Sequence, residues 1–332
     1  MTARIPGQPT TTAGAPAGVP DLRTRLGALE LANPVLTASG CAAAGRELEP
    51  YLDVAALGAV VTKSIQRAPR SGRGTPRMAE TPSGMLNSIG LQGPGIDAFC
   101  AVDLPWLRER GATAVVSVAG GDAAEFAELA GRLAGEPGVG ALEVNISCPN
   151  VADRGLVFAC DPVASAGVVG AVVEAVGGRV PVLVKLSPDV TDVVAVARAC
   201  LESGADGLVA VNTLLGMVID TGTMRPVLAG ITGGLSGPAI RPVAVRCVWQ
   251  LHAAMLAGVL PRAPIVGVGG VLTGLDALQF VLAGACAVQV GTSTFHDPGA
   301  AARVLAELAL ALAERGFDRF PDAVGVAHGV RA

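Results

Sequence analysis

Charged and aromatic side chains are both scarce in this chain of 332 residues. Charged residues make up 16% of the sequence and aromatic residues 3%, and 24 Lys and Arg stand against 28 Asp and Glu. A nucleic-acid partner would need a basic face or aromatic rings on which bases stack. The sequence predicts neither feature, so it does not favour a protein that binds nucleic acid. The 51% of hydrophobic residues and the 44 glycines instead predict an α/β protein with a large buried core.

The chain also lacks a hydrophobic run long enough to cross a membrane. Its longest uncharged stretch, residues 277–295, is interrupted by Gln279, Gly284, Gln289 and Gly291, whereas a spanning helix needs about 20 apolar residues. The first 20 residues are rich in Pro, Thr, Gly and Ala and contain no apolar segment of a signal peptide. We therefore predict a disordered tail over residues 1–20, one domain over residues 21–332, and a cytoplasmic protein without membrane contact.

Cysteine and histidine are too few and too scattered for a metal centre. The seven cysteines include no C-x-x-C pair, and there are three histidines, none in a recognisable motif. This spacing predicts neither a disulfide scaffold nor a zinc or iron–sulfur site. We expect no metal, and we expect proton transfer to use a group other than histidine.

Short apolar runs alternate along the chain with segments of helical periodicity. The predicted strands are Val35–Ala38, Ala59–Thr62, Ala114–Val118, Ala141–Asn145, Val182–Lys185, Gly207–Val211, Ile265–Val268 and Ala287–Val290. The predicted helices are Ala123–Leu133, Pro162–Val176, Val190–Ser203, Pro238–Ala257, Gly274–Ala283 and Ala300–Arg315. Strands that are apolar throughout are typical of a parallel sheet buried on both faces.

Eight such strands favour an α/β fold of the (β/α)8 TIM-barrel type, and an open doubly wound sheet is the alternative. Two connections, residues 63–113 and 212–264, are longer than one helix requires, and residues 149–161 form a third irregular loop. We expect these segments to be insertions at the C-terminal face of the barrel, where binding loops are usually found.

Each predicted strand ends on, or next to, a polar residue or a glycine. These residues are Ser39, Lys63, Ser117, Asn145, Lys185, Asn212, Gly269 and Gly291. Because the carboxyl ends of barrel strands meet at one mouth, we expect all eight to converge on one site.

The use of lysine and asparagine supports this site. Lys63 and Lys185 are the only lysines among the 24 basic residues, and each directly follows an apolar strand. Lysine at both places indicates sites that need a compact, reorientable ammonium and not the planar guanidinium of arginine. The alternative is that both lysines form ordinary ion pairs at the barrel rim. Asn145 and Asn212 also stand at strand ends, and Asn87 lies in the long connection of residues 63–113. Their amides suit a planar heterocycle with C=O and N–H groups, and Asx-turns are the alternative.

Two further features predict a phosphate site and a general base. Glycines follow the last two strands at Gly269, Gly270 and Gly291, where barrels commonly bind phosphate through backbone N–H groups, although tight turns also use glycine. Cys148, in Asn145-Ile-Ser-Cys-Pro-Asn150, begins the loop after the fourth strand. A thiol there can act as a general base, since its thiolate forms near about pH 8.5. The other six cysteines are expected to be inert.

The motifs together resemble those of the class 1 dihydroorotate dehydrogenases, most closely the class 1B catalytic subunit. The match runs from about residue 22 almost to the end of the chain, and its motifs occur in the family order. They are Ser39-Gly-Cys41, Val61-Thr-Lys63, Thr75-Pro-Arg77, Gly84-Met-Leu-Asn-Ser-Ile-Gly-Leu91, Asn145-Ile-Ser-Cys-Pro-Asn150, Val184-Lys-Leu-Ser-Pro188, Val211-Asn-Thr213, Thr232-Gly-Gly-Leu-Ser-Gly-Pro-Ala239 and Gly267-Val-Gly-Gly270.

The resemblance implies FMN at the barrel mouth. The residues implied for the cofactor are Ser39, Lys63, Ser64, Ser117, Asn145, Lys185, Val211, Gly237, Gly269, Gly270, Gly291 and Thr292. Within this set, the four glycines and Thr292 would hold the phosphate and ribityl chain, and Lys185 would lie beside the pyrimidine edge of the flavin. Ser117 stands where the family usually has an asparagine, so its contact with the flavin is the open point.

The resemblance also implies a substrate, a base and a partner. The residues implied for dihydroorotate are Lys63, Asn87, Ser88, Ile89, Gly90, Leu91, Asn145, Asn212 and Thr213. Cys148 would take a proton from C5 while hydride leaves C6 for flavin N5, which gives orotate for pyrimidine synthesis. Class 1B enzymes form a homodimeric core and pass electrons to NAD through a subunit with FAD and an iron–sulfur cluster.

Several other functions remain open on the sequence alone. A related FMN-dependent dihydropyrimidine or uracil oxidoreductase could keep a cysteine in the same loop, and a class 1A-type enzyme would reduce fumarate instead. A flavin-free phosphate-binding barrel and a catalytically silent relative are further alternatives. Lys63 favours the carboxylate of dihydroorotate, which uracil lacks.

Overall fold

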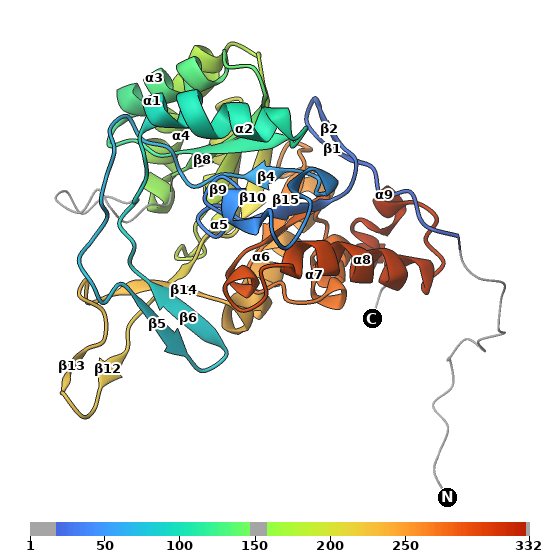
Figure 1. Ribbon diagram of the computed structural model, residues 1–332. Helices are drawn as coiled ribbons and strands as arrows, with labels where there is room; N and C mark the ends of the chain where they lie inside the picture. The colour runs from blue at the N-terminus through green and yellow to red at the C-terminus, as the bar shows by residue number, and fades with distance from the viewer. Residues whose placement is uncertain (1–17, 147–157, 330–332) are drawn as a thin grey trace, which may run out of the picture.

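A closed parallel barrel forms the centre of the molecule, which the computed structural model describes over residues 18–146 and 158–329 (Figure 1). Its strands are β3 (Val35–Thr37), β4 (Val60–Val61), β7 (Ala114–Val118), β8 (Val139–Asn145), β9 (Val182–Leu186), β10 (Gly207–Ala210), β15 (Ile265–Val268) and β16 (Ala287–Val290). The strand order is β3-β16-β15-β10-β9-β8-β7-β4. A parallel bridge between Leu36 and Ala59 joins the two ends. The predicted TIM barrel is confirmed, and the open sheet is excluded.

Helices surround the barrel as the periodicity predicted. They are α3 (Ala123–Leu133), α4 (Pro162–Val176), α5 (Val193–Glu202), α6 (Arg241–Leu256), α7 (Gly274–Leu282) and α8 (Ala300–Ala313), with the short α9 (Phe320–Ala323) after them. The helix predicted from Val190 begins at Val193 because the carboxylate of Asp192 accepts the N–H groups of the first turn. The helix predicted from Pro238 opens with a 3-10 turn, η5 (Pro238–Ile240), before α6.

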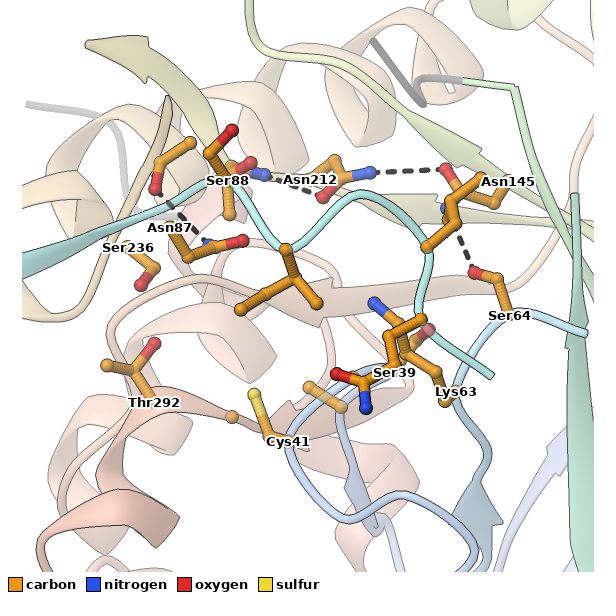
Figure 2. A pocket seen from close by; sticks show the side chains of 18 of the residues that line it. Ser39, Cys41, Lys63, Ser64, Asn87, Ser88, Asn145, Asn212, Ser236 and Thr292 are labelled. Atoms are coloured by element: carbon orange, nitrogen blue, oxygen red, sulfur yellow. Dashed lines mark hydrogen bonds between the residues drawn. The ribbon is translucent and has the colours of Figure 1, made fainter. Parts of the chain in front are cut away.

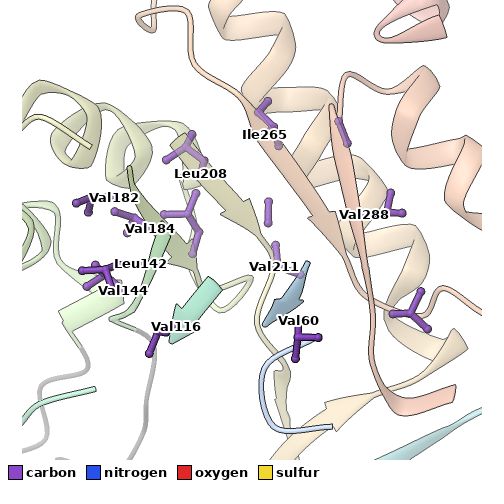
Figure 3. Close-up of a cluster of buried hydrophobic side chains, with 14 of the residues drawn as sticks. Val60, Val116, Leu142, Val144, Val182, Val184, Leu208, Val211, Ile265 and Val288 are labelled. Atoms are coloured by element: carbon purple, nitrogen blue, oxygen red, sulfur yellow. The ribbon is translucent and has the colours of Figure 1, made fainter. Parts of the chain in front are cut away.

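The strands bury both of their faces, so the barrel has two cores. Side chains that point outward, such as Val60, Val116 and Leu208, pack against the helices (Figure 3). Side chains that point inward, such as Val115 and Leu183, form a separate cluster inside the barrel. Burial on both faces explains why the strands read as nearly continuous apolar runs.

A β-hairpin that the sequence did not predict closes the amino-terminal end of the barrel. Strands β1 (Thr24–Leu26) and β2 (Leu29–Leu31) pair antiparallel. Leu26 and Leu31 are 0% and 2% exposed and belong to the cluster inside the barrel. The hairpin was missed because each strand has only three residues, too few to show a period.

Both long connections are insertions at the carboxyl ends of the strands, as predicted. The first contains β5 (Met78–Thr81), β6 (Gly84–Asn87), α1 (Ile96–Ala98), a π-helical segment η3 (Phe99–Asp103) and α2 (Leu104–Glu109). The second contains β11 (Leu214–Gly216), β12 (Ile219–Asp220), β13 (Arg225–Pro226) and β14 (Gly233–Ser236). They share one antiparallel sheet in the order β11-β14-β6-β5, a pairing that the sequence did not predict.

Among the described residues, no helix combines the length and the apolar character that crossing a membrane requires. The predicted tail lies outside the described residues up to position 17, as do Cys148 and most of the loop around it.

Candidate active site

A cavity of about 820 Å³ lies at the carboxyl ends of the barrel strands, beneath the inserted sheet (Figure 2). Of the eight residues at the strand ends, all except Ser117 line it. The other predicted site residues on its wall are Ser64, Asn87, Ser88, Ile89, Gly90, Leu91, Val211, Thr213, Gly237, Gly270 and Thr292. The expected convergence on one mouth is therefore confirmed for the described residues, with Ser117 as the exception.

Ser117 lies behind the cavity wall. Its side chain is fully buried, and its hydroxyl is 2.9 Å from that of Ser64, which does line the cavity. Ser117 therefore contacts a residue of the wall and does not itself line the cavity.

Ser64 in turn belongs to a chain of hydrogen bonds across the mouth. The amide of Asn145 donates to Ser64 Oγ at 3.0 Å, and the amide of Asn212 donates to Asn145 Oδ1 at 3.2 Å (Figure 2). The backbone N–H of Thr213 then donates to Asn212 Oδ1 at 2.8 Å. Because each amide is held by its neighbours, the direction in which its remaining donors and acceptors face the cavity is fixed.

Lys185 supplies a buried positive charge at the base of the cavity. The residue is 4% exposed, and its Nζ lies 3.4 Å from Glu143 Oε1 and 3.2 Å from Gln289 Oε1. Gln289 Nε2 also donates to Glu143 Oε2 at 2.7 Å. Glu143 and Gln289 are 0% and 1% exposed.

Lys63 comes from the other side of the mouth, directly after β4. Its ammonium packs against the loop after β3: a Cβ added at Gly40 would lie 3.1 Å from Lys63 Nζ. The backbone N–H of Lys63 donates to Ala43 O at 2.8 Å, which fixes where the side chain starts. The two lysines of the chain thus line the same cavity, as their positions after apolar strands predicted.

The segment from Asn87 to Leu91 forms the wall contributed by the inserted sheet. The amide of Asn87 donates to Gly234 O at 3.3 Å, which ties the end of β6 to β14. The sheet formed by the two insertions therefore positions this segment over the carboxyl ends of the barrel strands.

The glycines after β15 and β16 leave the backbone open at the cavity. A Cβ at Gly270, where φ is +75°, would lie 2.6 Å from Gly237 O. A Cβ at Gly291 would lie 3.1 Å from the Cβ of Ala38 and 3.4 Å from Cys41 Sγ. Side chains at these positions would crowd the wall, whereas glycine lets a ligand approach the backbone closely.

Cys41 is a wall residue that the sequence argument treated as inert. It lines the same cavity as the two lysines, and Figure 2 shows its side chain on the cavity wall. Desolvation raises the pKa of its thiol, and the positive charges of Lys185 and Lys63 offset only part of that rise. The thiol is therefore protonated near neutral pH.

Glu143 and Gln289 were also missed, although the sequence carried a signal for both. Each is a polar residue inside an otherwise apolar strand, two positions before a strand-end residue that was selected. With a period of two, Glu143 faces the same side as Asn145, and Gln289 the same side as Gly291.

The described residues contain no group of three or more His, Cys, Asp and Glu side chains arranged to hold a metal ion. A closed barrel with a large cavity at its mouth, lined by amides, ammonium groups and open glycine backbone, has the geometry with which barrel enzymes commonly bind phosphate-bearing ligands.

Comparison with known proteins narrows this class. The family model of dihydroorotate dehydrogenase matches residues 21–312. The chain belongs to the dihydroorotate dehydrogenase family, as its motifs predicted, and it is therefore an oxidoreductase.

Several relatives, among them the following three, carry the name dihydroorotate dehydrogenase B (NAD(+)), catalytic subunit. The protein of Geobacter sulfurreducens is 49% identical over 306 residues, which cover 92% of this chain and 98% of the relative. That of Desulforudis audaxviator is 50% identical, with 90% and 95% covered. That of Trichlorobacter lovleyi is 49% identical, with 93% and 99% covered.

Proposed function

We propose that this chain is the catalytic subunit of an enzyme that oxidises (S)-dihydroorotate to orotate in the synthesis of UMP, with FMN as its cofactor. The observation that carries the proposal is the single cavity that gathers both lysines of the chain, three of its asparagines and the glycines after β15 and β16. The relatives carry the name of that enzyme, and the match with this chain covers more than nine-tenths of the length of each.

The residues on the cavity wall fit FMN in size and in chemistry. A cavity of about 820 Å³ is large enough for a cofactor and a small substrate together. The open backbone at Gly270 and Gly291 suits a phosphate, and Thr292 adds a hydroxyl beside it. The remaining glycines of the predicted set, Gly237 and Gly269, line the same wall.

Ser39, Ser64, Asn145 and Val211 would line the flavin ring. When bound, FMN supplies the acceptor for a hydride. Lys185, buried at the base of the cavity, would stabilise the negative charge that builds up on the pyrimidine edge of the ring.

The substrate residues suit a small ring that carries a carboxylate. Lys63 would bind the carboxylate, while Asn212, Thr213 and the segment from Asn87 to Leu91 would face the ring amides. Asn145, held by Ser64 and bonded to Asn212, would contact both the flavin and the substrate. The fixed orientation of these amides orders the ring before reaction.

Cys148 would take the proton from C5 of dihydroorotate as hydride leaves C6. The residue lies outside the described part of the chain, and it follows the end of β8 by three positions. A base at this position would follow the strand that ends at Asn145. The same strand, β8, would therefore position both the base and the Asn145 amide that contacts the substrate.

A second subunit would carry the electrons onward to NAD. The relatives' names describe a catalytic subunit and NAD(+). The chain has no cluster-type cysteine spacing, so FAD and an iron–sulfur cluster would have to belong to the partner. We further propose a homodimeric core and a cytoplasmic location.

The test combines colour with an assay of acceptors. The purified chain should be yellow, and its flavin should be bleached by dihydroorotate without oxygen. NAD should be reduced only when the partner subunit is added. Reoxidation of the flavin by fumarate at the rate of turnover would instead favour a class 1A-type enzyme, and a colourless protein that takes up no FMN would contradict the proposal.

A further inference from the structure

Three buried polar side chains cross the barrel interior just below the cavity. Glu143 lies on β8, Lys185 on β9 and Gln289 on β16. In the closed strand order, β8 and β16 are separated by three strands in either direction, so the hydrogen bond between Glu143 and Gln289 joins opposite sides of the barrel. Layers inside such barrels are normally filled with branched apolar side chains.

Barrel stability alone does not account for this arrangement. Replacing a buried ion pair by well-packed apolar residues is often neutral or stabilising, because both charges must be removed from water. The layer immediately below is filled with apolar side chains from the same strands, with Ala141 on β8 and Leu183 on β9. The polar layer is therefore better explained by what lies above it.

Only one of the three side chains faces the cavity. Lys185 is part of its wall, whereas Glu143 and Gln289 are not and are almost fully buried. The two acceptors hold the ammonium from below, at 3.4 Å from Glu143 and 3.2 Å from Gln289. Gln289 also fixes the carboxylate, because its amide N–H group donates to Glu143 at 2.7 Å while its carbonyl accepts from Lys185.

We propose that Glu143 and Gln289 are positioning residues that hold the Lys185 ammonium at the base of the cavity and thereby set how strongly the bound flavin favours its reduced form. The proposal rests on the proposed function, since it requires FMN in this cavity. Glu143 balances the charge of the buried ammonium, and Gln289 locks both partners into one geometry. Neither residue touches the cofactor, so each acts through Lys185.

The reduction potential of the bound FMN tests this without turnover. Gln289→Met removes both hydrogen bonds of the amide at nearly constant volume. We expect the preference for reduced over oxidised FMN to fall by about tenfold, the size of a weakened charge-assisted hydrogen bond. For a two-electron couple this corresponds to about 30 mV, measurable by spectroelectrochemical titration against a reference dye.

The matched control uses a neutral background. In the Glu143→Gln, Lys185→Met double variant there is no ammonium to hold, so adding Gln289→Met should leave the potential unchanged within about twofold in the same preference. An equal drop in this background would show that Gln289 acts on the flavin by another route and would overturn the proposal.

Glu143→Asp keeps the charge and withdraws the carboxylate by one methylene, so it provides the same test if Gln289→Met fails to fold. We expect the potential to shift for this variant as well, because the ammonium loses one of the two acceptors that hold it. A yellow protein whose potential is unchanged by these substitutions would contradict this inference alone. A wild-type chain that binds no FMN would contradict the proposed function and this inference with it.

Discussion

On strand β8, Ala141 fills the lower half of the barrel interior, while Glu143 and Asn145 continue the same face into the upper half. Strand β9 shows the same change between Leu183 and Lys185. The period of two selects which side chains point inward, and the position along the strand then decides whether they meet the apolar layer or the cavity. The lower half is built for stability, and the upper half for binding and charge.

The largest effect is expected at the mouth, from Cys148→Ala. Loss of the general base should slow reduction of the flavin by dihydroorotate by about 10²-fold or more while the protein stays yellow. Stopped-flow absorbance without oxygen measures this directly. In the wild type, reduction should accelerate with pH as the thiolate forms, and a flat profile up to about pH 9 with reduction shown to be limiting would oppose the assignment.

The lower half of the barrel should respond in the opposite way. Leu183 is 1% exposed in the apolar cluster, so Leu183→Ala should lower the free energy of unfolding by about 2–5 kcal/mol through lost burial and a residual cavity. Urea denaturation measures the change. The Michaelis constant for dihydroorotate should stay at the wild-type value, and a change in it without a change in stability would break the division between the two halves.

For Lys63→Ala we expect the reverse of the Leu183→Ala result: the Michaelis constant should change and the stability should not. Removing the ammonium should raise the Michaelis constant for dihydroorotate about 10- to 100-fold, the range of a charge-assisted hydrogen bond to a carboxylate. Stability and flavin content should be close to wild type, because the side chain is only partly buried. An unchanged Michaelis constant would favour a substrate without a carboxylate, such as uracil.

The smallest expected change concerns the helical shell. Burial raises the pKa of Cys200 on α5 to about 12, so at pH 8 this thiol is almost entirely protonated and should resist alkylation in the folded protein. Labelling with iodoacetamide followed by peptide mass spectrometry should find Cys148 modified first and Cys200 only after unfolding. Equal labelling rates would contradict the contrast between the mouth and the shell.

The long elements were predictable from sequence because their signals are local. Apolar strands and capped helices such as the one from Ala123 to Leu133 repeat a pattern over enough residues to be recognised. Strand-end polarity likewise predicted seven residues of the cavity wall, from Ser39 and Lys63 to Gly291. The three-residue strands β1 and β2, and the pairing of β6 with β14, depend on contacts between distant segments, which no local pattern carries.

The buried polar layer illustrates a different limit. Glu143 and Gln289 could have been noticed as polar residues within apolar strands, yet their contact requires knowing that β8 and β16 lie opposite each other. Cys41 and Ser117 show the same limit: one lines the cavity and the other lies behind its wall, although both stand near strand ends in the sequence.

Anaerobic mixing of the purified flavoprotein with dihydroorotate tests the central claim most directly, because it requires the cofactor, the lysines and the base to act at one mouth. The account predicts that the visible flavin absorbance bleaches rapidly in the wild type, and much more slowly in Cys148→Ala. A yellow wild-type protein whose flavin dihydroorotate leaves oxidised would contradict it.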